Sequence, residues 1–296
     1  MRAEIKKIDE MMEAADYVTD PAIGMSVYLA MTLRKPLLVE GHAGVGKTEM
    51  AKVMAKMLGT NLIRLQCYEG LDAAQALYEW NYPKQLLHIK LEEGTAHSIE
   101  EKETEIFSPP FLIKRPLLQA ISATDTPPVL LIDEIDRADE EFEAFLLEIL
   151  SEFQITIPEI GTVKATHPPY VILTSNRVRE LSDALRRRCL YLWIDFPGFE
   201  KELRIVTRKV PGVNKRLARE ISRFMETART IRLAKVPGVA ETLDWAQALC
   251  SLHADHLDES LVNETLACVV KDADDIKRLK SELAKGGIER FISAAC

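Results

Sequence analysis

A glycine-rich segment that ends in lysine and threonine is the strongest chemical signal in the sequence. It reads GHAGVGKT from Gly41 to Thr48 and matches G-x-x-x-x-G-K-[ST] in full. Glycines let such a backbone curl until its N–H groups converge on a phosphate. Lys47 would neutralise the β and γ phosphates of a nucleotide, and the Thr48 hydroxyl would hold Mg²⁺. The nucleotide-binding residues expected from this loop are Gly41, Ala43, Gly44, Val45, Gly46, Lys47, Thr48 and Glu49.

Two adjacent carboxylates end a second apolar run, VLLIDE, which is typical of a buried strand. Ligands of open α/β sheets bind at the carboxyl ends of the strands, so Asp133 is expected to position Mg²⁺ there. Glu134 would orient and polarise the water that attacks the terminal phosphate. Taken alone, the segment could also be an acidic helix start. Its pairing with the phosphate loop favours the metal and water roles.

An amide and three arginines follow further along the chain. Asn176 ends the apolar run YVILTSN, and such an asparagine is usually a turn former. The order of the motifs instead favours a hydrogen bond from Asn176 to the γ-phosphate or to the attacking water. The arginines Arg186, Arg187 and Arg188 are either a solvated basic turn or a source of positive charge for a transferred phosphoryl group, supplied from a neighbouring subunit.

Strands and helices must alternate to position these side chains. The near-continuous apolar runs predict parallel strands covered on both faces. Helical periodicity lies between them, as in Met50, Val53, Met54 and Met57 after the loop. This alternation predicts an α/β fold with a parallel sheet. The predicted strands are Pro36–Glu40, Asn61–Cys67, Val129–Asp133, Tyr170–Ser175 and Cys189–Phe196.

The pattern changes at Phe196-Pro-Gly, beyond which only helical patterns follow. We therefore expect a nucleotide-binding αβα domain at residues 1–197 and a small helical domain at residues 198–296. Within the first domain, the polar stretch at about 84–110 predicts a surface insertion that is either solvated or in contact with a partner. A hairpin is expected at about 151–169.

Composition excludes several classes of protein. The 296 residues are 47% hydrophobic and 28% charged, as in ordinary globular proteins. The longest uncharged stretch, Pro21–Leu33, is too short to span a membrane, and the net charge of −8 argues against a general nucleic-acid binder. The chain opens with no leader-like segment and its five cysteines form no C-x-x-C, so a cytoplasmic location is expected. The six histidines show no metal-ligand spacing; His253 and His256 are read as a surface feature.

These motifs resemble those of the MoxR branch of the AAA+ ATPases. The segments GHAGVGKT, LLIDEIDRAD, TSN and SDALRRRC stand in that family's order, and the likeness runs from about Tyr17 to Asp272. The stretch LQCYEGLDAAQALYEWNYP, which begins at Leu65, resembles the subgroup that includes CoxD, a carbon monoxide dehydrogenase maturation factor.

The resemblance implies a five-stranded αβα domain with a helical lid, ATP and Mg²⁺ as cofactors, and a ring that is usually a hexamer. Each site would be completed by the next subunit. Arg188 stands where the family's trans-acting arginine finger falls, and Arg187 is the second choice. The implied function is chaperone-like: ATP hydrolysis remodels or matures a protein client, such as a metalloenzyme that receives its metal cofactor, often with a von Willebrand factor A-domain adaptor.

One position departs from that family's pattern. Glu241 stands where the lid usually presents a sensor arginine, although Arg232 or Lys235 could substitute. A carboxylate cannot neutralise a γ-phosphate, so a second function is carried forward: a nucleotide-gated assembly or binding module with slow hydrolysis. A DNA-acting motor is disfavoured by the acidic balance of the chain.

Overall fold

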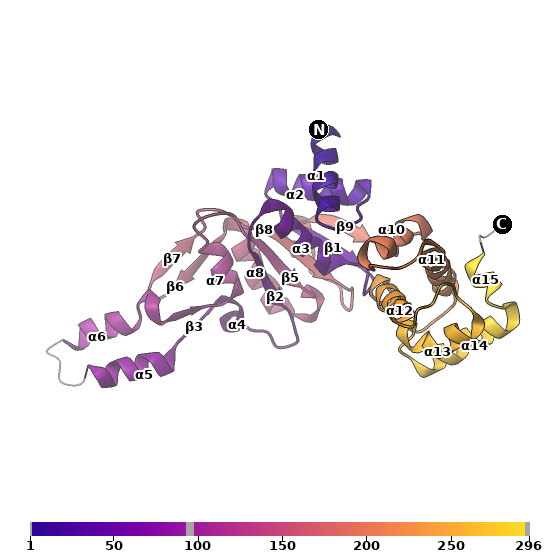
Figure 1. Cartoon of the computed structure of the whole chain (residues 1–296). Helices are drawn as coiled ribbons and strands as arrows, with labels where there is room; N and C mark the ends of the chain where they lie inside the picture. Colours follow the sequence, from indigo (N-terminus) through magenta and orange to yellow (C-terminus); the bar gives the residue numbers. More distant parts are fainter. Residues whose placement is uncertain (1, 93–97, 294–296) are drawn as a thin grey trace. The chain divides into compact units, whose positions relative to one another are not determined.

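The computed structural model describes residues 2–92 and 98–293 and divides into two compact parts. The first, named the sheet unit here, comprises Met1–Ile8, Pro21–Glu40 and Ala51–Leu192. The second, named the helical unit, comprises Asp9–Asp20, Gly41–Met50 and Trp193–Cys296. Figure 1 labels the elements of both. None of the helices in these described ranges combines the length and hydropathy that crossing a membrane requires.

Five strands form the main sheet, in the order β2-β5-β8-β1-β9. Strand β2 pairs with β5, β5 with β8, and β8 with β1, all in parallel. The strand bounds are β1 Leu37–Gly41, β2 Leu62–Gln66, β5 Val129–Asp133, β8 Tyr170–Ser175 and β9 Leu190–Ile194. The predicted parallel α/β fold followed by a helical part is confirmed, because each strand begins and ends within two residues of its predicted range.

Helices cover the sheet, which explains the uninterrupted apolar runs of its central strands. Every residue of β5 is buried. On one face Leu130 and Leu173 belong to a core that α7 and α8 complete. On the other face Ile172 lies near Ala30 of α2 and Met54 of α3. The helices that begin before residue 190 are α1 Arg2–Ala14, α2 Pro21–Leu33, α3 Lys47–Leu58, α4 Ala73–Leu77, α5 Tyr82–Leu91, α6 Ile99–Ile106, α7 Pro116–Ile121, α8 Glu140–Glu152 and α9 Asp183–Arg188.

The polar stretch around residues 84–110 is built from helices. An antiparallel ribbon of β3 (Tyr78–Trp80) and β4 (Leu112–Lys114) leads into and out of it. Figure 1 shows α5 and α6 side by side beyond this ribbon. Residues 93–97 of the expected insertion lie outside the described part of the chain. A second antiparallel pair, β6 (Gln154–Ile157) and β7 (Gly161–Lys164), forms a hairpin.

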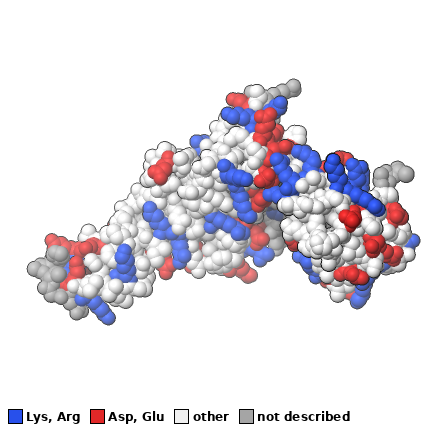
Figure 2. Space-filling view, in the orientation of Figure 1, with Lys and Arg blue, Asp and Glu red and all other residues white. Residues whose placement is uncertain are grey.

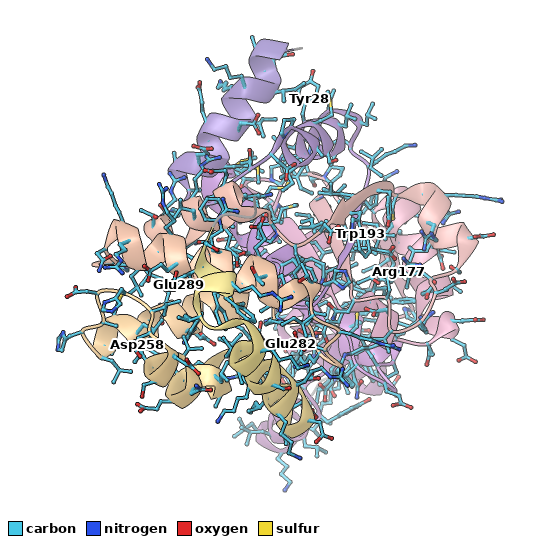
Figure 3. All side chains as sticks on the ribbon, turned by 90° about the vertical axis from the view of Figure 1, so that its right-hand side faces the viewer. Tyr28, Arg177, Trp193, Asp258, Glu282 and Glu289 are labelled. Carbon is cyan, nitrogen blue, oxygen red and sulfur yellow. The ribbon has the colours of Figure 1, made fainter. Side chains whose placement is uncertain are left out.

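The helical unit has its own core around Trp245. This side chain is fully buried, its ring centroid lies 4.9 Å from that of Phe224, and its indole N–H donates to Thr265 Oγ1 at 2.8 Å. Figure 3 labels Asp258 at the N-terminus of α13 and Glu282 on α14. The helices are α10 Phe199–Lys209, α11 Lys215–Thr230, α12 Val239–Ser251, α13 Glu259–Val269, α14 Ala273–Gly286 and α15 Glu289–Ile292.

A buried ion pair joins three of these helices. Glu202 of α10 is 0% exposed and its Oε1 lies 2.7 Å from Arg229 Nη2 of α11. The Thr242 hydroxyl of α12 donates to the same Glu202 oxygen at 2.6 Å. Arg229 also donates from Nε to the Pro237 carbonyl at 2.9 Å, which fixes the residue just before Gly238. The ion pair therefore sets where α12 begins.

We expect Glu202→Ala to destabilise the helical unit by about 3–5 kcal/mol, because it leaves the Arg229 guanidinium buried without its partner. Urea unfolding followed by circular dichroism measures the free energy of unfolding. The control is Asp274→Ala, which removes the exposed pair with Lys277 at 3.0 Å and should behave like the wild type. Equal stability of both variants would contradict a structural role for the Glu202–Arg229 pair.

Candidate functional site

Asp133, at the end of β5 in the sheet unit, accepts hydrogen bonds from side chains of the two neighbouring strands. Its side chain is 3% exposed. The Thr174 hydroxyl of β8 donates to Oδ1 at 2.5 Å, and Arg64 Nη2 of β2 donates to Oδ2 at 2.6 Å. Because these strands run in parallel and in register, the three side chains meet at one edge of the sheet. Asp133 is thus a fixed carboxylate whose charge is balanced by a guanidinium.

Glu134 leaves the strand in the left-handed conformation, at φ 56° and ψ 49°. Its N–H donates to Thr174 Oγ1 at 2.9 Å, so the same hydroxyl contacts both acidic residues. This backbone turn explains how two adjacent residues act at one edge although neighbours in a strand point to opposite faces. The Glu134 carboxylate then accepts from Asn176 Nδ2 at 3.4 Å and pairs with Arg137 Nε at 2.6 Å. Sequence reasoning predicted Glu134 and Asn176 but missed Thr174.

Asp136 fixes the chain that follows β8. It is buried, and its Oδ2 accepts the N–H groups of Asn176 at 3.1 Å and Val178 at 2.8 Å. Between them Arg177 adopts a left-handed conformation, with φ 58°. Figure 3 labels Arg177, whose Nε lies 3.8 Å from Glu40 Oε2. The motif DEID thus contributes its fourth residue as the support for Asn176, a role that the sequence did not reveal.

The arginines of α9 differ in what they contact. Arg186 Nη1 lies 3.6 Å from Glu40 Oε1, and its guanidinium lies over the Tyr191 ring, 5.6 Å from the ring centroid. Arg188 is exposed and donates to the Leu147 carbonyl at 2.6 Å, and Arg187 is also exposed. Arg186 is therefore used within its own sheet unit, whereas Arg187 and Arg188 are on the surface.

The phosphate loop belongs to the helical unit, and its shape requires glycine. Gly44 and Gly46 have φ of +76° and +95°, a region that other residues rarely adopt. A Cβ on Gly41 would lie 2.2 Å from the Ile194 carbonyl oxygen. Lys47, the first residue of α3, donates from Nζ to the carbonyls of Gly41 at 2.8 Å and His42 at 2.6 Å. The loop therefore wraps around the lysine that would face a phosphate.

Aromatic side chains hold the second residue of the loop. The His42 ring stacks on Phe196, with centroids 4.5 Å apart and an interplanar angle of 7°. It also meets Trp193 edge-on at 5.6 Å, a residue that Figure 3 labels. No pattern in the sequence predicts these contacts, because His42 occupies a variable position of the motif and its partners lie at the end of β9 and beyond it.

The start of α12 also contacts the phosphate loop. The N–H groups of Val239 and Ala240 both donate to the Gly44 carbonyl, at 2.9 and 3.2 Å. Gly238 approaches so closely that a Cβ there would lie 2.7 Å from the Ala43 oxygen. Glu241 accepts the Gly238 N–H at 2.9 Å through Oε2. Glu241, at the expected sensor-arginine position, is therefore a helix cap beside the loop. In the sequence, only the three-residue spacing between Gly238 and Glu241 indicates this capping role.

Together, the parallel sheet, the glycine loop with its lysine and the acidic end of β5 define a P-loop ATPase of the AAA+ class. The profile of the AAA domain family (dynein-related subfamily) matches residues 36–189, just over half of the chain, and the chain belongs to this family.

The chain is also similar in sequence to curated proteins and in fold to solved structures. Gas vesicle ATPase GvpN of Haloferax mediterranei is 25% identical over 262 residues, which cover 84% of this chain and 72% of that protein. An uncharacterized protein of Staphylococcus epidermidis is 25% identical over 205 residues, covering 67% and 70%. A putative ATPase from Cytophaga hutchinsonii has the same fold at a TM-score of 0.50 and 14% identity, covering 100% of this chain and 96% of that one. A mutant form of RuvB from Thermotoga maritima gives a TM-score of 0.50 and 18% identity, covering 96% and 78%.

The chain is accordingly an ATP hydrolase that uses ATP and Mg²⁺. The side chains fit this cofactor. The glycine loop and Lys47 offer backbone N–H groups and an ammonium for phosphates. Mg²⁺ prefers oxygen ligands, and within its own unit the Thr48 hydroxyl is one such group and the Asp133 carboxylate is another. Bound Mg²⁺ would neutralise charge that develops on the phosphates.

We expect Gly238→Ala to weaken ATP binding about tenfold, because the added methyl group must displace the Ala43–Gly44 backbone. Titration with a fluorescent ATP analogue measures the affinity. The matched control is Gly198→Ala at the start of α10, where a Cβ meets no atom within 4 Å. Unchanged affinity in Gly238→Ala, at wild-type Tm, would show that the contact with α12 does not shape the loop.

Proposed function

We propose that the chain is a MoxR-type AAA+ ATPase that hydrolyses ATP within an oligomeric ring, a hexamer in the family it resembles, and thereby remodels or matures a protein client. The main support for this proposal is the hydrogen bond from Asn176 Nδ2 to Glu134 Oε1 at 3.4 Å. The Thr174 hydroxyl fixes Glu134 by accepting its backbone N–H. A protein that only bound nucleotide would need the phosphate loop but no such pair. A cytoplasmic location is part of the proposal.

Each site residue has a role in this proposal. Gly41 to Glu49 hold the phosphates through backbone N–H groups and Lys47. Thr48 and Asp133 would hold Mg²⁺. Glu134 accepts a proton from the attacking water, and Asn176 orients either that water or Glu134 itself. Arg137 pairs with one Glu134 oxygen at 2.6 Å, but it is more than half exposed, so the pair is weak enough to yield to the reaction.

A neighbouring subunit would supply the positive charge that the γ-phosphate needs in the transition state. Arg188 is our first choice and Arg187 the second, because both are exposed. Arg186 fits this role less well, since it contacts Glu40 and Tyr191 of its own chain. Activity would then depend on assembly of the ring.

The insertion supports contact with a protein partner. Helix α5 exposes five large apolar side chains, namely Tyr82, Leu86, Leu87, Ile89 and Leu91. Isolated exposed apolar residues are common, but five on one ten-residue helix are typical of an interaction surface. We propose that this helix contacts the client or a von Willebrand factor A-domain adaptor. The most specific version of this proposal is a CoxD-like role, in which the client is a metalloenzyme that receives its cofactor.

The second candidate function is a nucleotide-gated assembly module with slow hydrolysis. The observation that favours it is Glu241, which caps α12 beside Gly44 where a sensor arginine would act on the γ-phosphate. Turnover measured with and without a partner distinguishes the two candidates, since a module of this kind stays slow in both cases.

We expect Glu134→Gln to bind ATP like the wild type and to lose turnover by about 10²–10⁴-fold, the usual contribution of a general base. Phosphate release and nucleotide affinity are measured side by side. Glu148→Gln, an exposed glutamate on α8, is the control and should retain turnover. Full turnover in Glu134→Gln would remove this residue from the mechanism.

We expect the specific activity of the wild type to rise with protein concentration and that of Arg188→Ala to stay lower by at least about tenfold. Mixing Arg188→Ala with Glu134→Gln should restore part of the turnover, because one subunit supplies the arginine and the other the glutamate. Arg187→Ala is the parallel variant. Activity that is flat with concentration and indifferent to both arginines would mean that the site is complete within one chain.

A further inference from the structure

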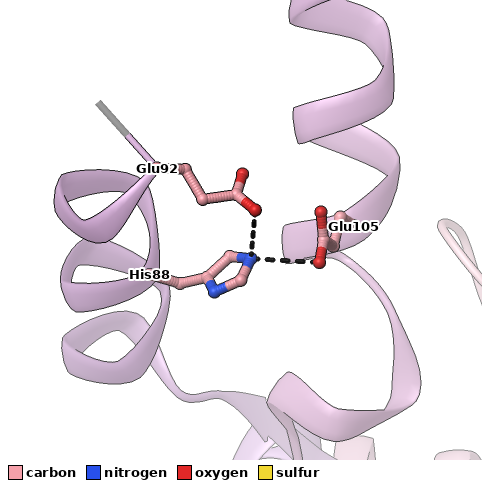
Figure 4. Close-up of side chains that lie close together, drawn as sticks. All are labelled: His88, Glu92 and Glu105. Carbon is pink, nitrogen blue, oxygen red and sulfur yellow. Dashed lines mark ion pairs between the residues drawn. The ribbon is translucent and has the colours of Figure 1, made fainter. Parts of the chain in front are cut away.

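A histidine and two glutamates converge between the helices of the insertion. His88 and Glu92 lie on α5 and at its end, and Glu105 lies on α6 (Figure 4). His88 Nε2 lies 3.1 Å from Glu105 Oε1 and 3.6 Å from Glu92 Oε1. One ligand atom from each residue lies within 4.8 Å of the other two. This cluster is remote in sequence from every residue assigned to ATP hydrolysis.

The backbone and the packing hold the cluster in place. His88 and Glu92 are four residues apart, so they share one face of the helix. The His88 ring packs against Phe111, with centroids 5.2 Å apart, which fixes its orientation. The side chains of His88 and Glu92 are only 28% and 17% exposed. These groups are therefore partly withdrawn from water before any ligand binds.

The His88 Nε2 atom has no hydrogen bond that would explain its position. It is buried and makes no hydrogen bond within the described residues, although Glu105 Oε1 and Glu92 Oε1 lie at ion-pair distances of 3.1 and 3.6 Å. A buried ring nitrogen without a hydrogen bond requires an explanation, and a metal ion shared with the two carboxylates would provide one.

The distances suit a tetrahedral transition metal. Bonds of about 2.0–2.1 Å from zinc to nitrogen and oxygen place neighbouring ligands about 3.4 Å apart. The observed separations of 3.1 and 3.6 Å lie on either side of that value. Imidazole nitrogen with carboxylate oxygen favours Zn²⁺ over Mg²⁺, which prefers oxygen ligands alone. We propose that His88, Glu92 and Glu105 bind a divalent transition metal of the zinc class, with water at the fourth position.

Such a metal would link α5 to α6, because His88 and Glu92 belong to the first helix and its end and Glu105 to the second. Hydrogen bonds also join this pair of helices: Gln85 Nε2 donates to the Ile106 carbonyl at 2.6 Å, and Lys102 Nζ donates to the Glu92 carbonyl at 3.3 Å. Figure 2 shows both acidic and basic side chains over these helices. The metal would hold α5, with its exposed apolar side chains, in a fixed position against α6.

The competing explanation is a protonated His88 that forms ion pairs with the two glutamates. The same three residues serve both explanations, so the test must detect the metal itself. Spacing along the sequence did not reveal the site, because its single histidine takes its third partner from another helix.

The test is a zinc titration of the full-length, nucleotide-free protein by isothermal calorimetry. We expect one Zn²⁺ per chain in the wild type and in the control His256→Ala, which removes a histidine outside the cluster. In His88→Ala and in Glu105→Gln the dissociation constant should rise at least about tenfold. Wild-type ATP turnover in both variants shows that they are folded.

Cobalt substitution reports the ligands directly. The Co²⁺ protein should show the visible d–d bands of a tetrahedral nitrogen and oxygen site, without the near-ultraviolet band of a thiolate, and His88→Ala should abolish them. Hydrogen exchange should show slower exchange of the α5 and α6 amides when Zn²⁺ is added. Absence of zinc binding, or binding equal in the wild type and His88→Ala, would overturn the proposal and leave the ion pair as the explanation.

Discussion

The Thr174 hydroxyl fixes the positions of Asp133 and Glu134 at the end of β5. It donates to Asp133 and accepts the N–H of Glu134, and Asp136 of the same segment holds the backbone of Asn176. These contacts are made across two adjacent parallel strands, so they exist only when the register is correct. Pairing of β5 with β8 therefore also brings Glu134 to Asn176.

A second line of contacts runs through the helical unit to the phosphate loop. The Glu202–Arg229 ion pair fixes Pro237, and the next residues of the chain meet Ala43 and Gly44. Buried ion pairs are weak evidence for stability but can specify a geometry. Here the Glu202–Arg229 pair fixes the position at which α12 begins. It therefore determines that the backbone of residues 238–240 lies against the phosphate loop. Glu241 belongs to this arrangement as the cap of α12, which gives the acidic residue at the expected sensor-arginine position a structural role.

The five strands of the sheet were predictable because parallel strands buried on both faces leave uninterrupted apolar runs. The phosphate loop, Asp133 and Glu134 were predictable because their spacing is imposed by chemistry on consecutive residues. Thr174 and Asp136 were not, since each acts through a contact between strands that no local pattern records. The helices α5 and α6 were missed because the whole stretch was interpreted as a polar insertion, although only α6 is mostly charged. His88 meets Glu105 only when those helices pair.

The approach of Gly238 to the loop restricts how this sequence can change over evolutionary time. Two backbones touch there without an intervening side chain, so a substitution at position 238 alters the space available at positions 43 and 44. Gly44 has a φ of +76°, which residues other than glycine rarely adopt. At position 238 only glycine avoids a clash between a Cβ and the Ala43 carbonyl oxygen. A side chain at either position would therefore displace the backbone at the other, although the two positions lie almost two hundred residues apart in the sequence.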